Sequence, residues 1–83
     1  MSTRAHALWD KAFREVERHR IGCEMGLGHT MSGEVSAPAI ARARVVLALS
    51  AKYASRSATR ARVALCLAWI DEAAGLLAAA EAR

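Results

Sequence analysis

The sequence is poor in the residues that mark several protein classes. It has one proline, two cysteines and four aromatic residues among 83, and no charge-free run in its second half exceeds eight residues. A membrane-spanning helix needs about 20 apolar residues, so we expect no membrane span. The N-terminus lacks the apolar core of about 7–15 residues found in secretory signals, and two cysteines make no disulfide scaffold. We therefore expect a cytoplasmic protein with free thiols.

Large apolar side chains are also scarce. Of the 45 apolar residues 20 are alanine, and only 20 leucine, valine, isoleucine and aromatic side chains remain to build a core. Each contributes roughly 1.5–3 kcal/mol when fully buried, against a conformational entropy cost of similar total size. We expect residues 1–83 to form a single small domain that gains stability by pairing with a second copy.

Glycine and proline are concentrated in one segment. Four of the five glycines and the only proline lie between residues 22 and 38. Apolar residues in 3–21 recur at spacings of three and four, which predicts an amphipathic helix that Gly22 ends. Residues 22–37 show no sustained period. We expect a long Gly-rich loop there, of a length typical of functional or mobile loops.

The rest of the chain favours helix throughout. Hydroxyl residues at 55–59 offer local hydrogen bonds that compete with a helix, so we predict helices over 38–55 and 58–82, joined as a hairpin. One continuous helix, supported by a partner chain along its length, is the alternative. The expected fold is all-α: a three-helix protein made of an N-terminal helix and a helical hairpin, which forms a homodimeric bundle.

Both predicted hairpin helices carry apolar residues on two sides. Each has a seam in which large and small residues alternate, and each has a second apolar stripe as well. A helix that is apolar on two sides packs on two sides, and a symmetric dimer is the commonest way to cover the second. We expect the subunit or partner interface to include Tyr53, Leu65, Trp69 and Leu76.

Positive charge is concentrated in one part of the chain. Residues 35–70 contain six basic residues and no acidic ones, although the net charge of the whole chain is only +4. A basic face attracts an acidic protein surface or phosphate groups. An ordinary solvated surface, filled with good helix formers, is the alternative explanation. The predicted basic face consists of Arg42, Arg44, Lys52, Arg56, Arg60 and Arg62.

One group of residues suggests metal binding. His19 and Cys23 are four residues apart, and His29 follows in the Gly-rich segment. Zinc accepts imidazole and thiolate ligands of this kind. Gly22 interrupts the helical spacing, however, and no Cys-x-x-Cys pair is present. A free cysteine and two surface histidines are the alternative.

No motif in the sequence specifies a catalytic reaction. Residues 26–33 are glycine-rich like a phosphate-binding loop, but they lack the Lys-Ser/Thr pair and follow a predicted helix rather than a strand. Cys23 with a histidine would need a third group to orient the base, and none is identifiable. We therefore expect a protein that is not an enzyme and needs no cofactor.

The sequence favours a small regulatory or inhibitory protein, acting as a homodimer. In this hypothesis the basic helical face binds an acidic surface of a partner protein. A helical dimer that binds nucleic acid is the second hypothesis, although the connection between the last two helices lacks the glycine common in helix-turn-helix motifs. A metal-responsive module built on His19, Cys23 and His29 is the third.

Overall fold

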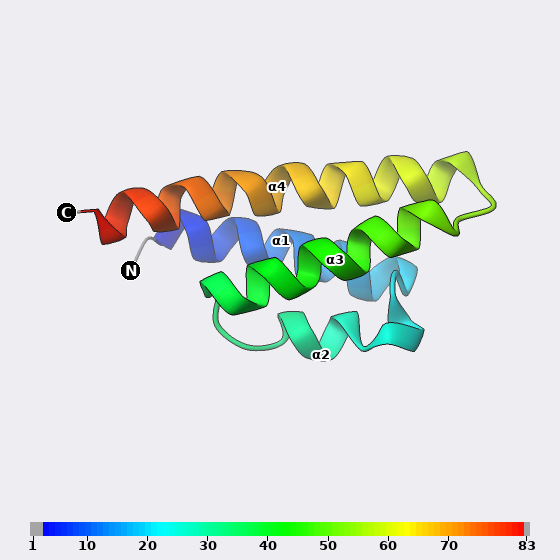
Figure 1. The fold of residues 1–83 in the computed structure, drawn as a ribbon, viewed down its shortest axis with the longest axis horizontal. Helices are drawn as coiled ribbons and strands as arrows, with labels where there is room; N and C mark the ends of the chain where they lie inside the picture. The colour runs from blue at the N-terminus through cyan, green and yellow to red at the C-terminus, as the bar shows by residue number, and fades with distance from the viewer. Residues whose placement is uncertain (1–2, 83) are drawn as a thin grey trace.

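Four α-helices and one 3-10 helix make up the regular structure of residues 3–82, the part of the chain that the computed structural model describes. Helix α4 runs antiparallel to both α1 and α3 and packs against each of them (Figure 1). The molecule is a rod of 43 × 20 × 19 Å. The all-α prediction is confirmed. The elements are α1 (Thr3–His19), η1 (Cys23–Met25), α2 (Leu27–Met31), α3 (Ala37–Lys52) and α4 (Ser57–Glu81).

Helix α1 forms where its apolar spacing predicts, but it ends earlier than expected, and a residue other than Gly22 ends it. Its buried side chains recur every three or four positions along one face. The chain leaves the helix at Arg20, which has a left-handed φ of 53°. The Ile21 amide donates to Val16 O at 3.0 Å and the Arg20 amide to Glu17 O at 3.4 Å, the bond pattern of a Schellman motif. Arg20, and not Gly22, therefore ends the helix.

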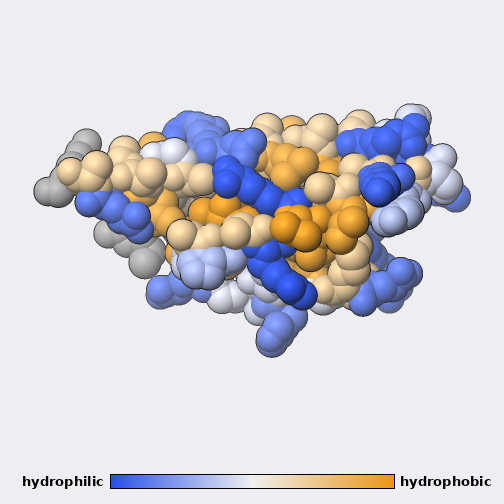
Figure 2. Space-filling view, in the orientation of Figure 1, coloured by the Kyte–Doolittle hydropathy of each residue, from blue (hydrophilic) through white to orange (hydrophobic). Residues whose placement is uncertain are grey.

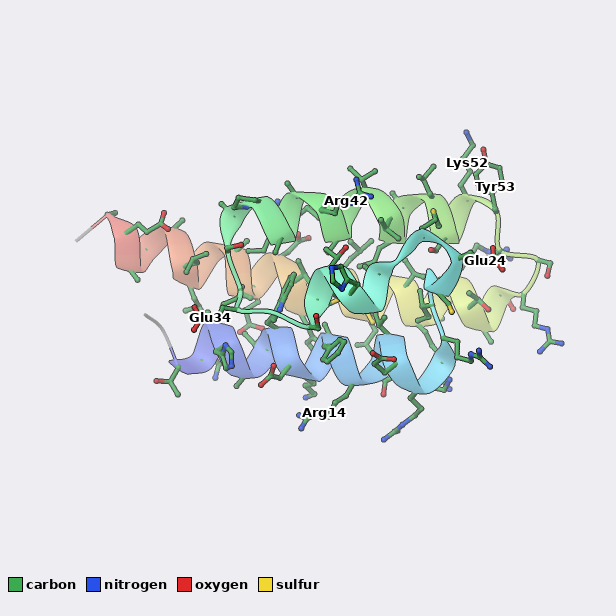
Figure 3. All side chains as sticks on the ribbon, turned by 90° about the horizontal axis from the view of Figure 1, so that it is seen from below. Arg14, Glu24, Glu34, Arg42, Lys52 and Tyr53 are labelled. Carbon is green, nitrogen blue, oxygen red and sulfur yellow. The ribbon has the colours of Figure 1, made fainter. Side chains whose placement is uncertain are left out.

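The prediction of a long Gly-rich loop over 22–37, and with it the three-helix count, is wrong. This segment holds η1 and the short helix α2, whose Leu27 and Met31 are buried. Helix α2 lies over α1 and α3 on the side opposite α4 (Figures 1 and 3). A helix of five residues is too short to produce a recognisable apolar period, so the sequence pattern could not reveal it.

Close packing of this segment depends on Gly22. Its φ is 61°, and a Cβ added there would lie 2.9 Å from both Leu27 Cβ and Val46 Cγ1. Only glycine combines this backbone conformation with so little space. Gly26, with φ 72°, ends η1 in open space. Gly22 and Gly26 therefore provide the turns that let this segment pack against the core.

Residues 37–81 form a helical hairpin, and the continuous-helix alternative is wrong. The Ser36 side chain accepts a hydrogen bond from the Ala39 amide at 3.3 Å, and Pro38 occupies the first turn of α3. Helix α3 ends at Lys52, the chain turns through residues 53–56, and α4 begins at Ser57. Folding back in this way brings buried residues of both helices, such as Leu47 and Ile70, into one hydrophobic cluster with residues of α1.

One hydrophobic cluster joins all four α-helices. Trp9, completely buried, donates from Nε1 to Met31 O at 3.2 Å and to Gly33 O at 3.3 Å, which ties α1 to the segment after α2. No polar or charged residue is buried within the described part of the chain. The core is therefore held by apolar packing and by backbone hydrogen bonds.

Helix α4 has a length and composition that would also suit a membrane span. It has 25 residues, and its most apolar stretch has a mean hydropathy of 1.7. Two acidic residues of α4 form ion pairs with neighbouring helices: Asp71 with Arg44 of α3, and Glu72 with Arg4 of α1. Length and composition alone do not distinguish a core helix from a membrane helix. The absence of a membrane span therefore stays a prediction.

Candidate functional site

The end of the rod where α3 turns into α4 carries an open groove. The C-terminus of α1, η1 and the α3–α4 turn meet there. The groove has a volume of about 550 Å³, and part of its lining is apolar, from Ile21, Met25 and Leu49. We call it the turn groove. Its full lining is His19, Arg20, Ile21, Gly22, Cys23, Glu24, Met25, Leu49, Ser50, Tyr53 and Thr59.

Tyr53 is the most exposed large apolar side chain of the described residues, at 74%. It follows the last residue of α3, and Figure 3 shows Tyr53 and Lys52 projecting together from this end of the molecule, with Glu24 at the same end. The Lys52 ammonium lies 5.5 Å from the centre of the Tyr53 ring, within the range of a cation–π contact. The rim of the groove thus combines an aromatic ring with positive charge.

Four basic residues at the turn end form no ion pair with an acidic side chain of residues 3–82. Arg20 lines the groove, Lys52 is the last residue of α3, Arg56 directly precedes α4, and Arg60 lies in the first turn of α4. Arg60 donates from Nη1 to Ala54 O at 2.9 Å, which fixes its position across the turn. These four charges are available to an acidic ligand.

Two residues of the predicted basic face lie elsewhere and are paired. Arg44 donates to Asp71 Oδ1 at 2.7 and 3.0 Å, and Arg62 Nη1 lies 3.3 Å from Glu15 Oε2. Arg42 is exposed on α3, away from the turn (Figure 3). The six predicted residues therefore do not act as one continuous face, because the antiparallel packing places acidic residues of α1 and α4 beside two of them.

The four predicted interface residues lie on two different surfaces. Leu65, Trp69 and Leu76 form a stripe on the side of α4 that faces α1. Trp69 is half-buried, with the Lys11 ammonium 4.9 Å from its ring centre, and Leu76 is also half-buried. Leu65 is 44% exposed. Tyr53 is separate from this stripe, at the turn groove.

The predicted metal ligands do not assemble. Within residues 3–82, no three histidine, cysteine or acidic side chains are grouped as metal ligands would be. His19 lines the turn groove with Cys23, but its Nε2 lies 3.5 Å from Glu15 Oε2. Cys23 and His29 line a second, adjacent groove. The segment bends at the left-handed residues Arg20 and Gly22, so His19 and Cys23 do not share a helical face.

The second thiol, Cys66, is buried in the core and unsuited to nucleophilic chemistry. Burial, with a smaller contribution from the Glu15 carboxylate, raises the pKa of Cys66 from 9.0 to about 11, and Arg62 partly opposes this. Its Sγ lies 3.9 Å from Ala12 O as a weak hydrogen-bond donor. A neutral, inaccessible thiol of this kind packs as a small apolar side chain.

Sequence reasoning missed Arg20 and the apolar lining of the groove. Arg20 lies outside the acid-free window, so charge counting did not select it. An arginine two residues before a glycine at a predicted helix end was the available signal. Ile21 and Met25 were assigned to the helix end and to a loop, and neither predicts a groove by itself.

Comparison of the chain with protein-family models, with curated proteins and with solved structures finds no match. The function is therefore inferred from the residues of the site.

Proposed function

We propose that this protein is a non-enzymatic regulatory or inhibitory protein that binds an acidic segment of a partner protein at its turn end. The observation that carries the proposal is that Arg20 lines the turn groove and that Lys52, Arg56 and Arg60 lie within three residues of its lining residues Tyr53 and Thr59. None of the four forms an ion pair with an acidic residue of the described chain. Positive charge attracts the partner, and the groove accepts its apolar side chains.

The groove supports a protein ligand over a nucleic acid. Ile21, Met25, Leu49 and Tyr53 offer apolar contacts of the kind that anchor protein interfaces, where aromatic residues and methionine are enriched. Nucleic-acid binding draws most of its affinity from a row of phosphate contacts. The pairing of Arg44 with Asp71 removes the middle of such a row along α3.

The backbone of Arg20 supports a role for this side chain. A left-handed conformation costs a non-glycine residue about 1 kcal/mol, and glycine is usual at this position of a Schellman motif. An arginine that gives up stability here fits a function for its charge, because functional positions are where such costs persist.

The test compares two double variants with the same loss of charge. Arg20→Gln/Arg56→Gln removes two cations at the turn end, whereas Arg14→Gln/Arg42→Gln removes two exposed cations away from it (Figure 3). The tagged wild-type chain captures partners from cells that produce it, and affinity for the captured protein is then measured directly. We expect at least about tenfold weaker binding for the turn-end variant only, and wild-type binding that weakens in moderate salt.

Two outcomes would contradict the proposal. Equal binding by both double variants would remove the turn end from the mechanism. Capture that disappears on nuclease treatment, together with retardation of DNA or RNA by the pure protein at low salt, would favour the nucleic-acid hypothesis instead.

A further inference from the structure

One face of the rod, formed by α3 and α4, has an ordered sequence of features along its length. This is the face toward the viewer in Figures 1 and 2, and Figure 2 shows apolar surface on both of its helices with charged residues between. Because α3 and α4 are antiparallel, residue numbers rise along α3 while they fall along α4. The order of features follows directly from these numbers.

The first feature is a small apolar groove far from the turn. It has a volume of about 150 Å³ and lies between the N-terminal half of α3 and the C-terminal half of α4. Ile40 belongs to the hydrophobic core and Leu77 packs against it, and Glu81, the last residue of α4, also lines the groove. We call it the α3–α4 groove. Its lining is Ala37, Ile40, Ala41, Arg44, Ala74, Leu77, Ala78 and Glu81.

The remaining features lie between this groove and the turn. The Arg44–Asp71 ion pair comes first, with both side chains about half exposed. Val45 follows on α3, 60% exposed although valine is apolar. Lys52 and Arg60 lie last, beside the turn. From the Glu81 end to the turn, the face therefore carries a negative charge, the apolar groove, the ion pair, the exposed valine and positive charge, in that order.

We propose that this face binds a second copy of the same chain through a two-fold axis that passes midway between Val45 and the α3–α4 groove. The axis reverses the order of features, so Val45 of each copy meets the α3–α4 groove of the other. Glu81 of each copy then meets Lys52 and Arg60 of the other. The face is self-complementary in shape and charge, as an isologous interface must be.

The shape of the face suits a second copy. Helix α3 has 16 residues, about 24 Å, and packs against the longer α4, so the two helices present an elongated surface. The exposed alanines along it, such as Ala41 and Ala64, let two helical surfaces approach closely. The turn groove opens beside η1 and the end of α1, so Arg20 and Arg56 take no part in the dimer contacts, whereas Lys52 and Arg60 pair with Glu81 of the second copy when the dimer forms. The proposal does not depend on the proposed function.

The first experiment measures molecular mass in solution over a range of protein concentrations by sedimentation or light scattering. The wild-type chain is expected to associate into a dimer. Val45→Glu places a charge where an apolar side chain enters the other copy, so dimer affinity should fall at least tenfold. The matched control is Leu65→Glu, which adds the same charge at an exposed apolar position on the α1 side of α4 and should leave the dimer intact. Far-UV circular dichroism verifies that both variants fold.

A charge-reversal cycle tests the orientation. Lys52→Glu and Glu81→Lys should each weaken the dimer, and the double variant should recover affinity because opposite charges meet again. A wild-type chain that stays monomeric at every concentration would overturn the proposal. So would equal dissociation by Leu65→Glu and Val45→Glu, or a double variant no better than the single ones. Partner capture by monomeric Val45→Glu would show that the turn-end site stands separately.

Discussion

The connection from α1 to α3 buries Leu27, Met31 and Val35, whereas the connection from α3 to α4 leaves Tyr53 74% exposed. The first, residues 20–36, is fastened to the core by hydrogen bonds from Trp9 and by the close approach of Gly22. The second, residues 53–56, is a turn with Arg60 bonded across it. Both are rich in small and polar residues, yet one is part of the core and the other presents side chains to solvent.

This difference shows that composition alone does not reveal what a connection does. The first connection packs into the core because it contains large apolar residues, and each side chain of that size gains about 1.5–3 kcal/mol on burial. The second connection has one large apolar residue, Tyr53, and its ring lies outside the core. Substitutions in each connection test whether burial of large side chains separates the two.

Gly22→Ala should be the most damaging small change in the first connection. The new Cβ would overlap Leu27 and Val46 at 2.9 Å, and alanine disfavours a φ of 61°. We expect the free energy of unfolding to fall by about 3 kcal/mol or more, measured by urea denaturation. Gly26→Ala is the control: its site is open, so only the backbone cost of about 1 kcal/mol remains. Equal losses would mean that the segment is not closely packed.

Removing one large side chain from each connection compares their contributions directly. Leu27→Ala creates a cavity at a fully buried site and should lower the free energy of unfolding by about 3 kcal/mol. Tyr53→Ala removes an exposed ring and should change it by less than about 0.5 kcal/mol, while weakening partner binding. Similar losses of stability in the two variants would show that the two connections do not differ in how they pack against the core.

The reactivities of the two thiols test how deeply each is buried: Cys23 lies in the first connection and Cys66 in the core. Cys23 is exposed and should react rapidly with thiol reagents, whereas Cys66 should react only after unfolding. The pKa of Cys66 is raised to about 11 in the folded chain, so the unfolded thiol ionises first. The free energy of unfolding is therefore unaffected by this thiol below pH 9, and it falls by about 2–3 kcal/mol as the pH rises from 9 to 11. Cys66→Ala should remove this part of the pH dependence, and an unchanged pH profile would argue against deep burial.

Arg20→Gly should have a small effect on stability, opposite in sign to that of the core substitutions. Glycine accepts the left-handed conformation at the end of α1, so the variant should gain about 1 kcal/mol while partner binding weakens. Ser55→Gly in the second connection has no positive φ to relieve and should not stabilise the chain. Denaturant midpoints of the two variants provide the measurement. A destabilised Arg20→Gly variant would show that the arginine side chain supports the fold.

The sequence identified the three long helices well because their signals are local. Apolar spacing places α1, Ser36 and Pro38 mark the start of α3, and the hydroxyl residues after Tyr53 mark the break before α4. Helix α2 escaped the same reasoning because five residues hold little more than one turn, and Leu27 and Met31 do not make a period. The site was found only in part: Lys52, Arg56 and Arg60 were selected by charge, whereas Arg20 was not.

Local sequence patterns are sufficient to predict the helical class, the approximate extents of the long helices and the excess of positive charge in the second half. These depend on neighbours within a few residues of one another. Which charges remain free depends on the tertiary packing: Arg44 and Arg62 find acidic partners 27 and 47 residues away, and Arg20 lines the same groove as Tyr53, 33 residues later. Such pairings depend on the register of antiparallel helices, which the packing of the core sets and no local pattern encodes.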